Sequence, residues 1–169
     1  MGYIHDTAMA QFISPDAIRA SAGTWTFKVA TNVWSNDRTA ADASFTLYVP
    51  ILIPSNTVAL KGAYLKSIEL MWAVSTAAMD AVDDGAVYAD TLAANGTLNT
   101  AAEVTSTPDT GHDTGAERLT LDEHRMKVTL TTPVWIDNDQ AYHLEVVCDA
   151  AATSVFKVFG AIINYTLRL

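Results

Sequence analysis

Apolar and polar residues alternate with a period of two along most of this chain. The alternation is clearest in the segments Phe45-Leu47-Val49, Ile68-Leu70-Trp72-Val74, Met126-Val128-Leu130 and Tyr142-Leu144-Val146-Cys148. A period of two puts successive side chains on opposite faces of a β-strand, so each segment predicts a strand with one buried face. Because no amphipathic stretch of helical length separates them, the pattern favours antiparallel sheets.

Three other segments add to this picture. Ser14 as a cap, Pro15 in the first turn and Gly23 as a terminator predict a short helix near the start of the chain. The stretch from Trp25 to Val33 alternates again and predicts a single strand with one buried face. The last segment, residues 155–163, carries apolar side chains on both faces, which predicts a strand between two layers or against a neighbouring subunit.

These elements predict an all-β fold, an antiparallel β-sandwich that is jelly-roll-like and has one short N-terminal helix. Residues 1–23 are expected to form an N-terminal arm and the helix, and residues 24–169 the β-sandwich domain. The acidic stretch Asp137-Asn138-Asp139 lies between two apolar segments and predicts the tip of a β-hairpin.

Composition narrows the function classes. The chain has 19 acidic and 10 basic residues, a net charge of −9, and only 17% charged residues. Without a basic run that could neutralise phosphates, we expect no nucleic-acid binding, and the acidity also argues against binding to anionic membranes. The first residues show no signal peptide and no stretch is long enough to span a membrane, so a soluble protein is expected. The low charge favours contacts between subunits.

Most catalytic templates are missing from the sequence. There is no Gly-x-Ser-x-Gly, no phosphate-binding loop, no His-Glu-x-x-His and no Cys-x-x-Cys. The single cysteine, Cys148, lies at an inward position and is expected to be a small buried hydrophobic residue. We therefore predict no enzyme, no catalytic residues and no cofactor.

The stretch 109–115, which reads DTGHDTG, comes closest to a named motif. Asp113-Thr114-Gly115-Ala116 resembles the signature of aspartic proteases, a resemblance that would imply two facing aspartates sharing a proton. No apolar strand precedes this signature, so a polar loop is the preferred interpretation. The sequence leaves open whether a divalent metal binds Asp109, His112, Asp113 and His124, or the 137–139 turn, and no metal site is predicted.

The tryptophans divide into two groups. Trp25 and Trp72 fall in the apolar phase of their segments and predict core packing. Trp34 and Trp135 fall near strand ends, where capping the core is the preferred interpretation and an exposed ring that stacks on a sugar or contacts a neighbouring subunit is the alternative.

The absence of catalytic motifs leaves a protein that binds or builds. In architecture the whole chain resembles small jelly-roll proteins of virions: capsid, decoration or tail-fibre head subunits. That resemblance implies a structural protein located in the virion, which associates with copies of itself or with a capsid lattice and other virion proteins. The alternative location is the cytoplasm. The residues expected at the subunit interface are Phe156, Val158, Phe159 and Ile162. The alternative is a carbohydrate-binding β-sandwich module that uses Trp34, Trp135 and Tyr142.

Overall fold

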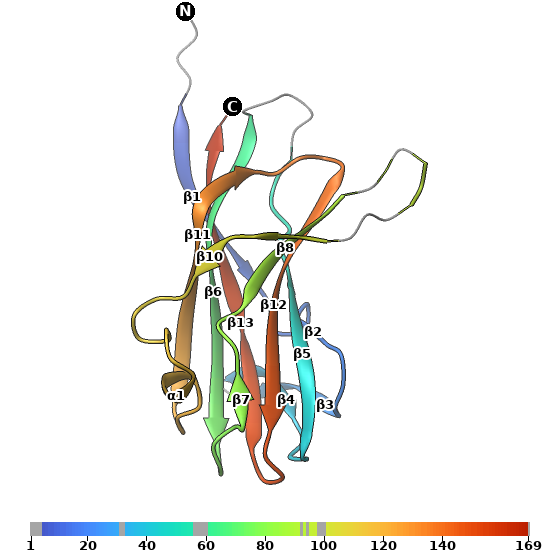
Figure 1. The fold of residues 1–169 in the computed structure, drawn as a ribbon. Helices are drawn as coiled ribbons and strands as arrows, with labels where there is room; N and C mark the ends of the chain where they lie inside the picture. The colour runs from blue at the N-terminus through green and yellow to red at the C-terminus, as the bar shows by residue number, and fades with distance from the viewer. Residues whose placement is uncertain are drawn as a thin grey trace, which may run out of the picture.

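The computed structural model describes residues 5–30, 33–55, 61–91, 93, 95–97 and 101–168. These residues form an antiparallel β-sandwich, which confirms the predicted fold class (Figure 1). The strands are β1 (Asp6–Ile13), β2 (Arg19–Ala20), β3 (Trp25–Ala30), β4 (Val33–Arg38), β5 (Ala43–Pro50), β6 (Gly62–Ser75), β7 (Ala81–Val82), β8 (Ala86–Thr91), β9 (Ala102–Val104), β10 (Ser106–Thr107), β11 (Glu123–Trp135), β12 (Gln140–Ala150) and β13 (Val155–Arg168), and the helix α1 spans Gly115–Arg118.

The strands divide between two sheets. One sheet has the order β10-β11-β6-β13-β4-β3, with β1 paired to β13; the other has the order β2-β5-β12-β8-β9, with β7 paired to β12. We call them the larger sheet and the smaller sheet. Long strands that follow one another in sequence, such as β5 and β6 or β11, β12 and β13, cross from one sheet to the other. Such crossings are also a property of jelly rolls.

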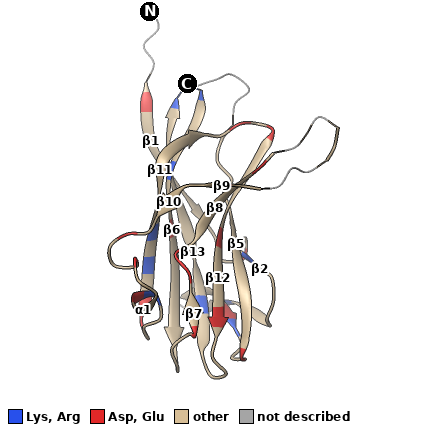
Figure 2. Ribbon diagram, viewed as in Figure 1, with Lys and Arg blue, Asp and Glu red and all other residues tan. Residues whose placement is uncertain are grey.

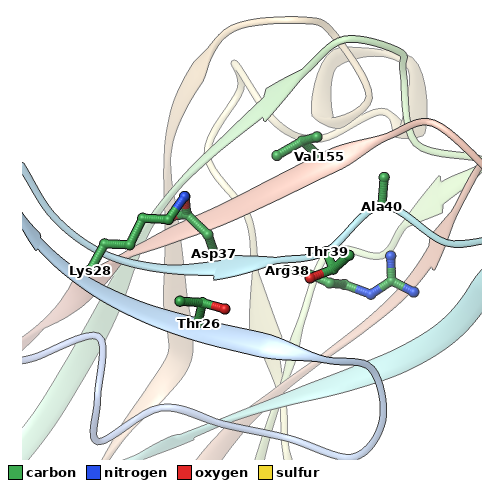
Figure 3. A pocket seen from close by; sticks show the side chains of 7 residues that line it. All are labelled: Thr26, Lys28, Asp37, Arg38, Thr39, Ala40 and Val155. Carbon is green, nitrogen blue, oxygen red and sulfur yellow. The ribbon is translucent and has the colours of Figure 1, made fainter.

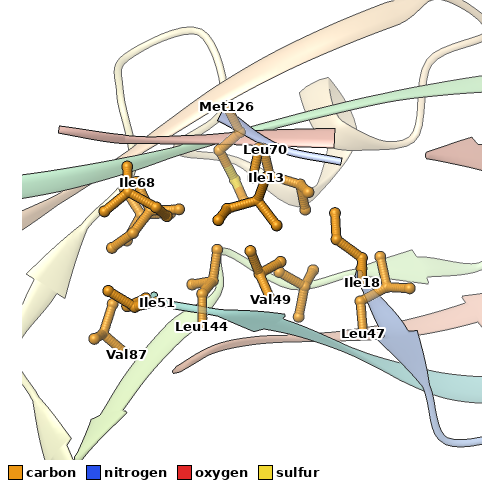
Figure 4. Packing of buried hydrophobic residues seen from close by; sticks show 14 of the residues in the cluster. Ile13, Ile18, Leu47, Val49, Ile51, Ile68, Leu70, Val87, Met126 and Leu144 are labelled. Atoms are coloured by element: carbon orange, nitrogen blue, oxygen red, sulfur yellow. The ribbon is translucent and has the colours of Figure 1, made fainter. Parts of the chain in front are cut away.

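The core fills the space between the inner faces of the two sheets (Figure 4). Leu47, Val49 and Leu144 of the smaller sheet face Leu70 and Met126 of the larger one, and all five are almost completely buried. Burial of a side chain of this size stabilises the fold by about 1.5–3 kcal/mol relative to exposure. The predicted alternation therefore identified the inward positions of the central strands.

The predicted N-terminal helix is wrong in its position. Residues after Ser14 make a single turn, closed by a hydrogen bond of 3.0 Å from the Ala17 amide to the Ser14 carbonyl, and the chain then enters β2. The one helix of the described chain is α1, a four-residue helix in the loop before β11. The local turn signals at Ser14 and Pro15 are real, but ladder pairing of β2 with β5 competes with further helix hydrogen bonds.

The residues predicted as an N-terminal arm also join the sheets. β1 pairs antiparallel with β13 over its whole length, with Asp6 opposite Arg168 and Ile13 opposite Ala161. The Arg168 guanidinium donates hydrogen bonds of 2.6 and 2.7 Å to the Asp6 carboxylate at the far end of the pair. The first and last strands of the chain thus lie side by side (Figure 1).

Two predicted strand arrangements are corrected by the pairing. The segment from Trp25 to Val33 is not one strand: β3 and β4 form a hairpin in which Ala30 pairs with Val33. The 137–139 turn does not close a hairpin, because β11 belongs to the larger sheet and β12 to the smaller one. Alternation shows which residues share a face of a strand, but it contains no information on the partner of that strand.

Candidate functional site

The outer face of the smaller sheet carries a row of aromatic side chains from three adjacent strands. Because Leu47, Val87 and Leu144 point into the core, the pleat turns Tyr48 of β5, Tyr88 of β8 and His143 of β12 outward. Tyr88 lies directly opposite His143 in the ladder. The His143 ring centroid is 5.8 Å from that of Tyr88, in a stacked arrangement, and 6.0 Å from that of Tyr48.

Two carboxylates hold the central ring of this row. The His143 Nδ1 atom is 3.3 Å from the Asp90 Oδ2 atom, and its Nε2 atom is 3.0 Å from the Glu145 Oε1 atom. A carboxylate therefore lies within reach of each ring nitrogen, so whichever nitrogen carries the N–H has an acceptor. We call the surface made by Tyr48, Tyr88, Asp90, His143 and Glu145 the aromatic face.

The aromatic face is acidic as well as aromatic. Glu103 of β9 lies opposite Tyr88 in the ladder. Desolvation, together with the nearby carboxylates of Glu103, Glu145 and Asp83, raises the pKa of the Tyr88 hydroxyl above its ordinary value. A tyrosine hydroxyl is protonated at neutral pH even at its ordinary pKa of about 10, so Tyr88 is available as a hydrogen-bond donor. Acidic residues occur on several strands and loops of the sandwich (Figure 2).

A pocket of about 430 Å³ opens where β5 ends and β12 begins, and His143 belongs to both the pocket and the aromatic face. Its apolar lining includes Leu52, Ile136 and Tyr142, and Gln140 is among its polar lining residues. A volume of this size is within the range of small-molecule pockets, about 300–1,000 Å³. We call it the strand-end pocket.

The polar groups of the strand-end pocket are already oriented. The Gln140 Nε2 atom donates a hydrogen bond of 3.1 Å to Thr91 Oγ1, while its Oε1 atom accepts one from the Tyr142 hydroxyl. Burial, with the carboxylates of Asp137 and Asp139, raises the pKa of Tyr142. Because these side chains already hold one another in place, ordering them on ligand binding would cost little conformational entropy.

The structure does not bring the three predicted sugar-binding residues together. Tyr142 lines the strand-end pocket and is only 8% exposed. Trp135, at the end of β11, packs on Tyr64 with a centroid distance of 4.6 Å and lies 5.0 Å from the Arg168 guanidinium. Trp34 belongs to β4 of the larger sheet and is 45% exposed. Of the three, only Tyr142 contributes to the site described above.

The predicted interface residues separate into two pairs along β13. Phe156 and Val158 are buried between the sheets, so they belong to the core and their prediction as interface residues is wrong. Phe159 and Ile162 are half-buried and point away from the core. Phe159 is outward by ordinary alternation from Val158. Ile162 is outward because the phase of the strand changes at the register shift between Val158 and Gly160, which inserts an extra residue, so that Gly160 and Ala161 are both buried.

The DTGHDTG stretch has a structural role in the described residues. The Asp109 carboxylate accepts a hydrogen bond of 2.8 Å from the Lys127 amide and lies 3.1 Å from His112 Nδ1. Burial raises the pKa of Asp109, but these two hydrogen bonds outweigh it and hold the pKa below its ordinary value. Asp113 is exposed, whereas a protease dyad requires a second aspartate facing it across the site.

The other histidine of this region packs by its ring. His124 is stacked on the buried Trp72 with a centroid distance of 4.8 Å, and His112 lies 5.6 Å from His124. No group of three or more His, Cys, Asp or Glu side chains within the described ranges is arranged to hold a metal ion. In the same ranges, no helix is long and apolar enough to cross a membrane.

Sequence analysis missed Tyr48, Tyr88 and His143 because it followed the buried phase of each strand. All three occupy the polar phase of their strands and lie half-buried on the outer face of the sheet rather than in the core. The signal in the sequence is an aromatic residue at an outward position in each of three separate strands. That the three strands are neighbours is a property of the sheet order alone.

No protein-family model and no curated protein sequence matches the chain. Among solved structures, the chain is similar to TmCBM61, solved in complex with beta-1,4-galactotriose, at a TM-score of 0.36 and 8% identity, covering 96% of this chain and 88% of that chain.

Proposed function

We propose that the protein binds a carbohydrate on the aromatic face and in the adjoining strand-end pocket. The observation that carries the proposal is the row Tyr48, His143 and Tyr88, with centroid spacings of 6.0 and 5.8 Å, on an open sheet face. The C–H groups of a pyranose form apolar surfaces that pack against aromatic rings. A row of rings therefore suits a short oligosaccharide better than it suits a compact ligand.

The polar groups beside the rings supply the second part of sugar recognition. Asp90 and Glu145 side chains are 34% and 30% exposed, so their carboxylates keep lone pairs that can accept hydrogen bonds from sugar hydroxyls. Hydrogen bonds to an ionised acceptor are about twice as strong as neutral ones. The contacts with His143 restrict the movement of these carboxylates, which lowers the entropy lost on binding.

The test is isothermal titration calorimetry with soluble oligosaccharides selected on a glycan array. We expect Tyr48→Ala and Tyr88→Ala each to weaken binding by about tenfold or more, because central aromatic anchors carry most of the affinity at such sites. Trp34→Ala and Trp135→Ala are matched controls, since each removes an aromatic ring outside the site.

The proposal fails if no glycan binds, or if binding survives both tyrosine substitutions. Loss of binding in Trp34→Ala or Trp135→Ala, with both tyrosine variants unaffected, would place a sugar site elsewhere. Circular dichroism of each variant separates loss of binding from loss of folding.

The virion role stays a prediction. Nothing in the described part of the chain favours a virion subunit over any other protein that binds copies of itself. Self-association is a separate matter, because one edge of the larger sheet offers a specific surface for it.

A further inference from the structure

β3 is an edge strand whose outer side has no partner strand in the described chain. On its inner side β3 pairs with β4, and just beyond the strand the Thr39 amide donates a hydrogen bond of 2.9 Å to the Thr24 carbonyl. Hydrogen-bonded pairs alternate along an antiparallel ladder, so the backbone groups of Trp25, Phe27 and Val29 point to the free edge. An open edge of this kind is a template for pairing with another chain.

The side chains next to this edge are unusually apolar for a surface. Val29 is 75% exposed, and the three rings of what we call the hairpin cluster, Phe12, Phe27 and Trp34, are 48%, 44% and 45% exposed. Trp34 lies between the other two, with centroid distances of 5.8 Å to Phe12 and 6.4 Å to Phe27. Isolated exposed apolar residues need no explanation, but a contiguous cluster indicates an interaction surface.

We propose that two copies of this chain form a reversible homodimer by antiparallel pairing of β3 with β3 of the second copy. In a two-fold arrangement centred on Phe27, that residue lies opposite its own counterpart, and Val29 lies opposite Trp25. This register aligns the outward backbone groups of both strands as hydrogen-bonded pairs. It also places the exposed apolar side chains of the two copies on one face.

The charges permit this register. Lys28 is the one charged residue of β3, and it lies opposite Thr26 of the second copy rather than opposite another lysine. Its Nζ atom is 2.7 Å from the Asp37 Oδ2 atom of its own chain (Figure 3), so the charge is already paired. Lysine on an edge strand commonly discourages pairing, and the ion pair removes much of that effect here.

The available area fits a reversible dimer rather than an obligate one. With nearly half of each ring exposed, the hairpin cluster presents roughly 250–300 Å² of aromatic surface per copy. The sum over two copies, together with Val29 and the paired backbone, is an upper limit on the buried area, because rings on one face of a continuous sheet lie beside one another; even this limit does not exceed about 1,000 Å² by much. Interfaces at the low end of the size range are typical of weak, transient complexes, so we expect a dimer that dissociates on dilution.

The experiment is sedimentation velocity of the full chain over a concentration series from micromolar to millimolar. The wild type is expected to pass from monomer to dimer. Phe27→Lys places two positive charges opposite each other and is expected to weaken the dimer at least about tenfold. Leu121→Lys is the matched control, because it changes an exposed apolar residue at 56% exposure outside the edge and is expected to leave the dimer unchanged.

A mixing experiment tests the register itself. Phe27→Lys and Phe27→Glu should each be monomeric alone, and an equimolar mixture should form a heterodimer, since residue 27 of one copy faces residue 27 of the other. A wild type that stays monomeric throughout the series overturns the proposal. So does a dimer that Phe27→Lys leaves intact, or a mixture that fails to associate while both variants remain folded by circular dichroism.

Discussion

Gly160 of β13 is the position where the structure makes the sharpest prediction about stability. Its φ is +131°, a conformation that L side chains rarely adopt, and it lies at the register shift in the pairing of β13 with β6. A Cβ atom there would lie 2.6 Å from the Ile13 carbonyl oxygen and 2.7 Å from the Phe12 ring. Gly160→Ala therefore combines backbone strain with a steric clash against β1.

The expected magnitude follows from these two effects. Holding a residue other than glycine in such a backbone conformation costs about 1–3 kcal/mol. Inserting a methyl group into a space already filled costs about 1–3 kcal/mol more, because the Ile13 carbonyl can move only with its strand. Gly160→Ala should thus lower the free energy of unfolding by about 2–6 kcal/mol, which corresponds to a Tm lower by roughly 4–24 °C in a domain of this size.

Urea denaturation and thermal melting, both followed by circular dichroism, measure this effect. Gly96→Ala is the matched control: its φ is +77°, but no heavy atom lies within 4 Å of the added Cβ. Gly96→Ala should lower the free energy of unfolding only by the strain of the left-handed conformation, about 1–2 kcal/mol. In a Phe12→Ala background the penalty of Gly160→Ala should shrink, because one clashing group is gone. A Gly160→Ala variant no less stable than Gly96→Ala would refute the reasoning.

Three further predictions concern the core and its ionisable groups. Leu144→Ala should lower the free energy of unfolding by about 2–5 kcal/mol in urea denaturation, because Leu144 is fully buried between the sheets. Burial raises the pKa of Asp83 above its ordinary value of 3.8, so the ionised carboxylate destabilises the fold as the pH rises above that value. The free energy of unfolding of Asp83→Asn, relative to that of the wild type, should therefore increase as the pH rises from 3 to 7. A stability difference between the two proteins that does not change with pH would contradict this. Burial and, to a smaller extent, the nearby Asp83 carboxylate strongly raise the pKa of Cys148, so its thiol is not ionised in the folded protein. Because the thiolate is the reactive form, a thiol-reactive dye should label Cys148 only as fast as the protein unfolds.

Charge at the aromatic face narrows the ligand that the proposed function would take. Asp90, Glu145 and Glu103 surround the rings, and Arg19 of β2 is the one lysine or arginine in the described strands of the smaller sheet. An anionic sugar would meet several carboxylates of like charge, so we expect neutral oligosaccharides to bind in preference to those with carboxylate or sulfate groups.

What the sequence by itself determined is local. The alternation of Tyr142-Leu144-Val146-Cys148 predicts an inward face, and the structure confirms that Leu144, Val146 and Cys148 are buried. Trp72, predicted to pack in the core, is completely buried as well. These predictions succeed because the period of a strand depends on adjacent residues alone.

Only the tertiary structure decided which strands are neighbours. The residues around Phe156 and Ile162 do not show that an extra residue between them changes which face of the strand points inward. As a result, Phe156 lies in the core and Ile162 lies outside it. Nothing local to Trp135 shows that the chain leaves one sheet there and enters the other. The aromatic face likewise exists only because β5, β12 and β8 are adjacent. The physical reason is that strand pairing joins residues distant in sequence, and its register depends on the packing of the whole sandwich.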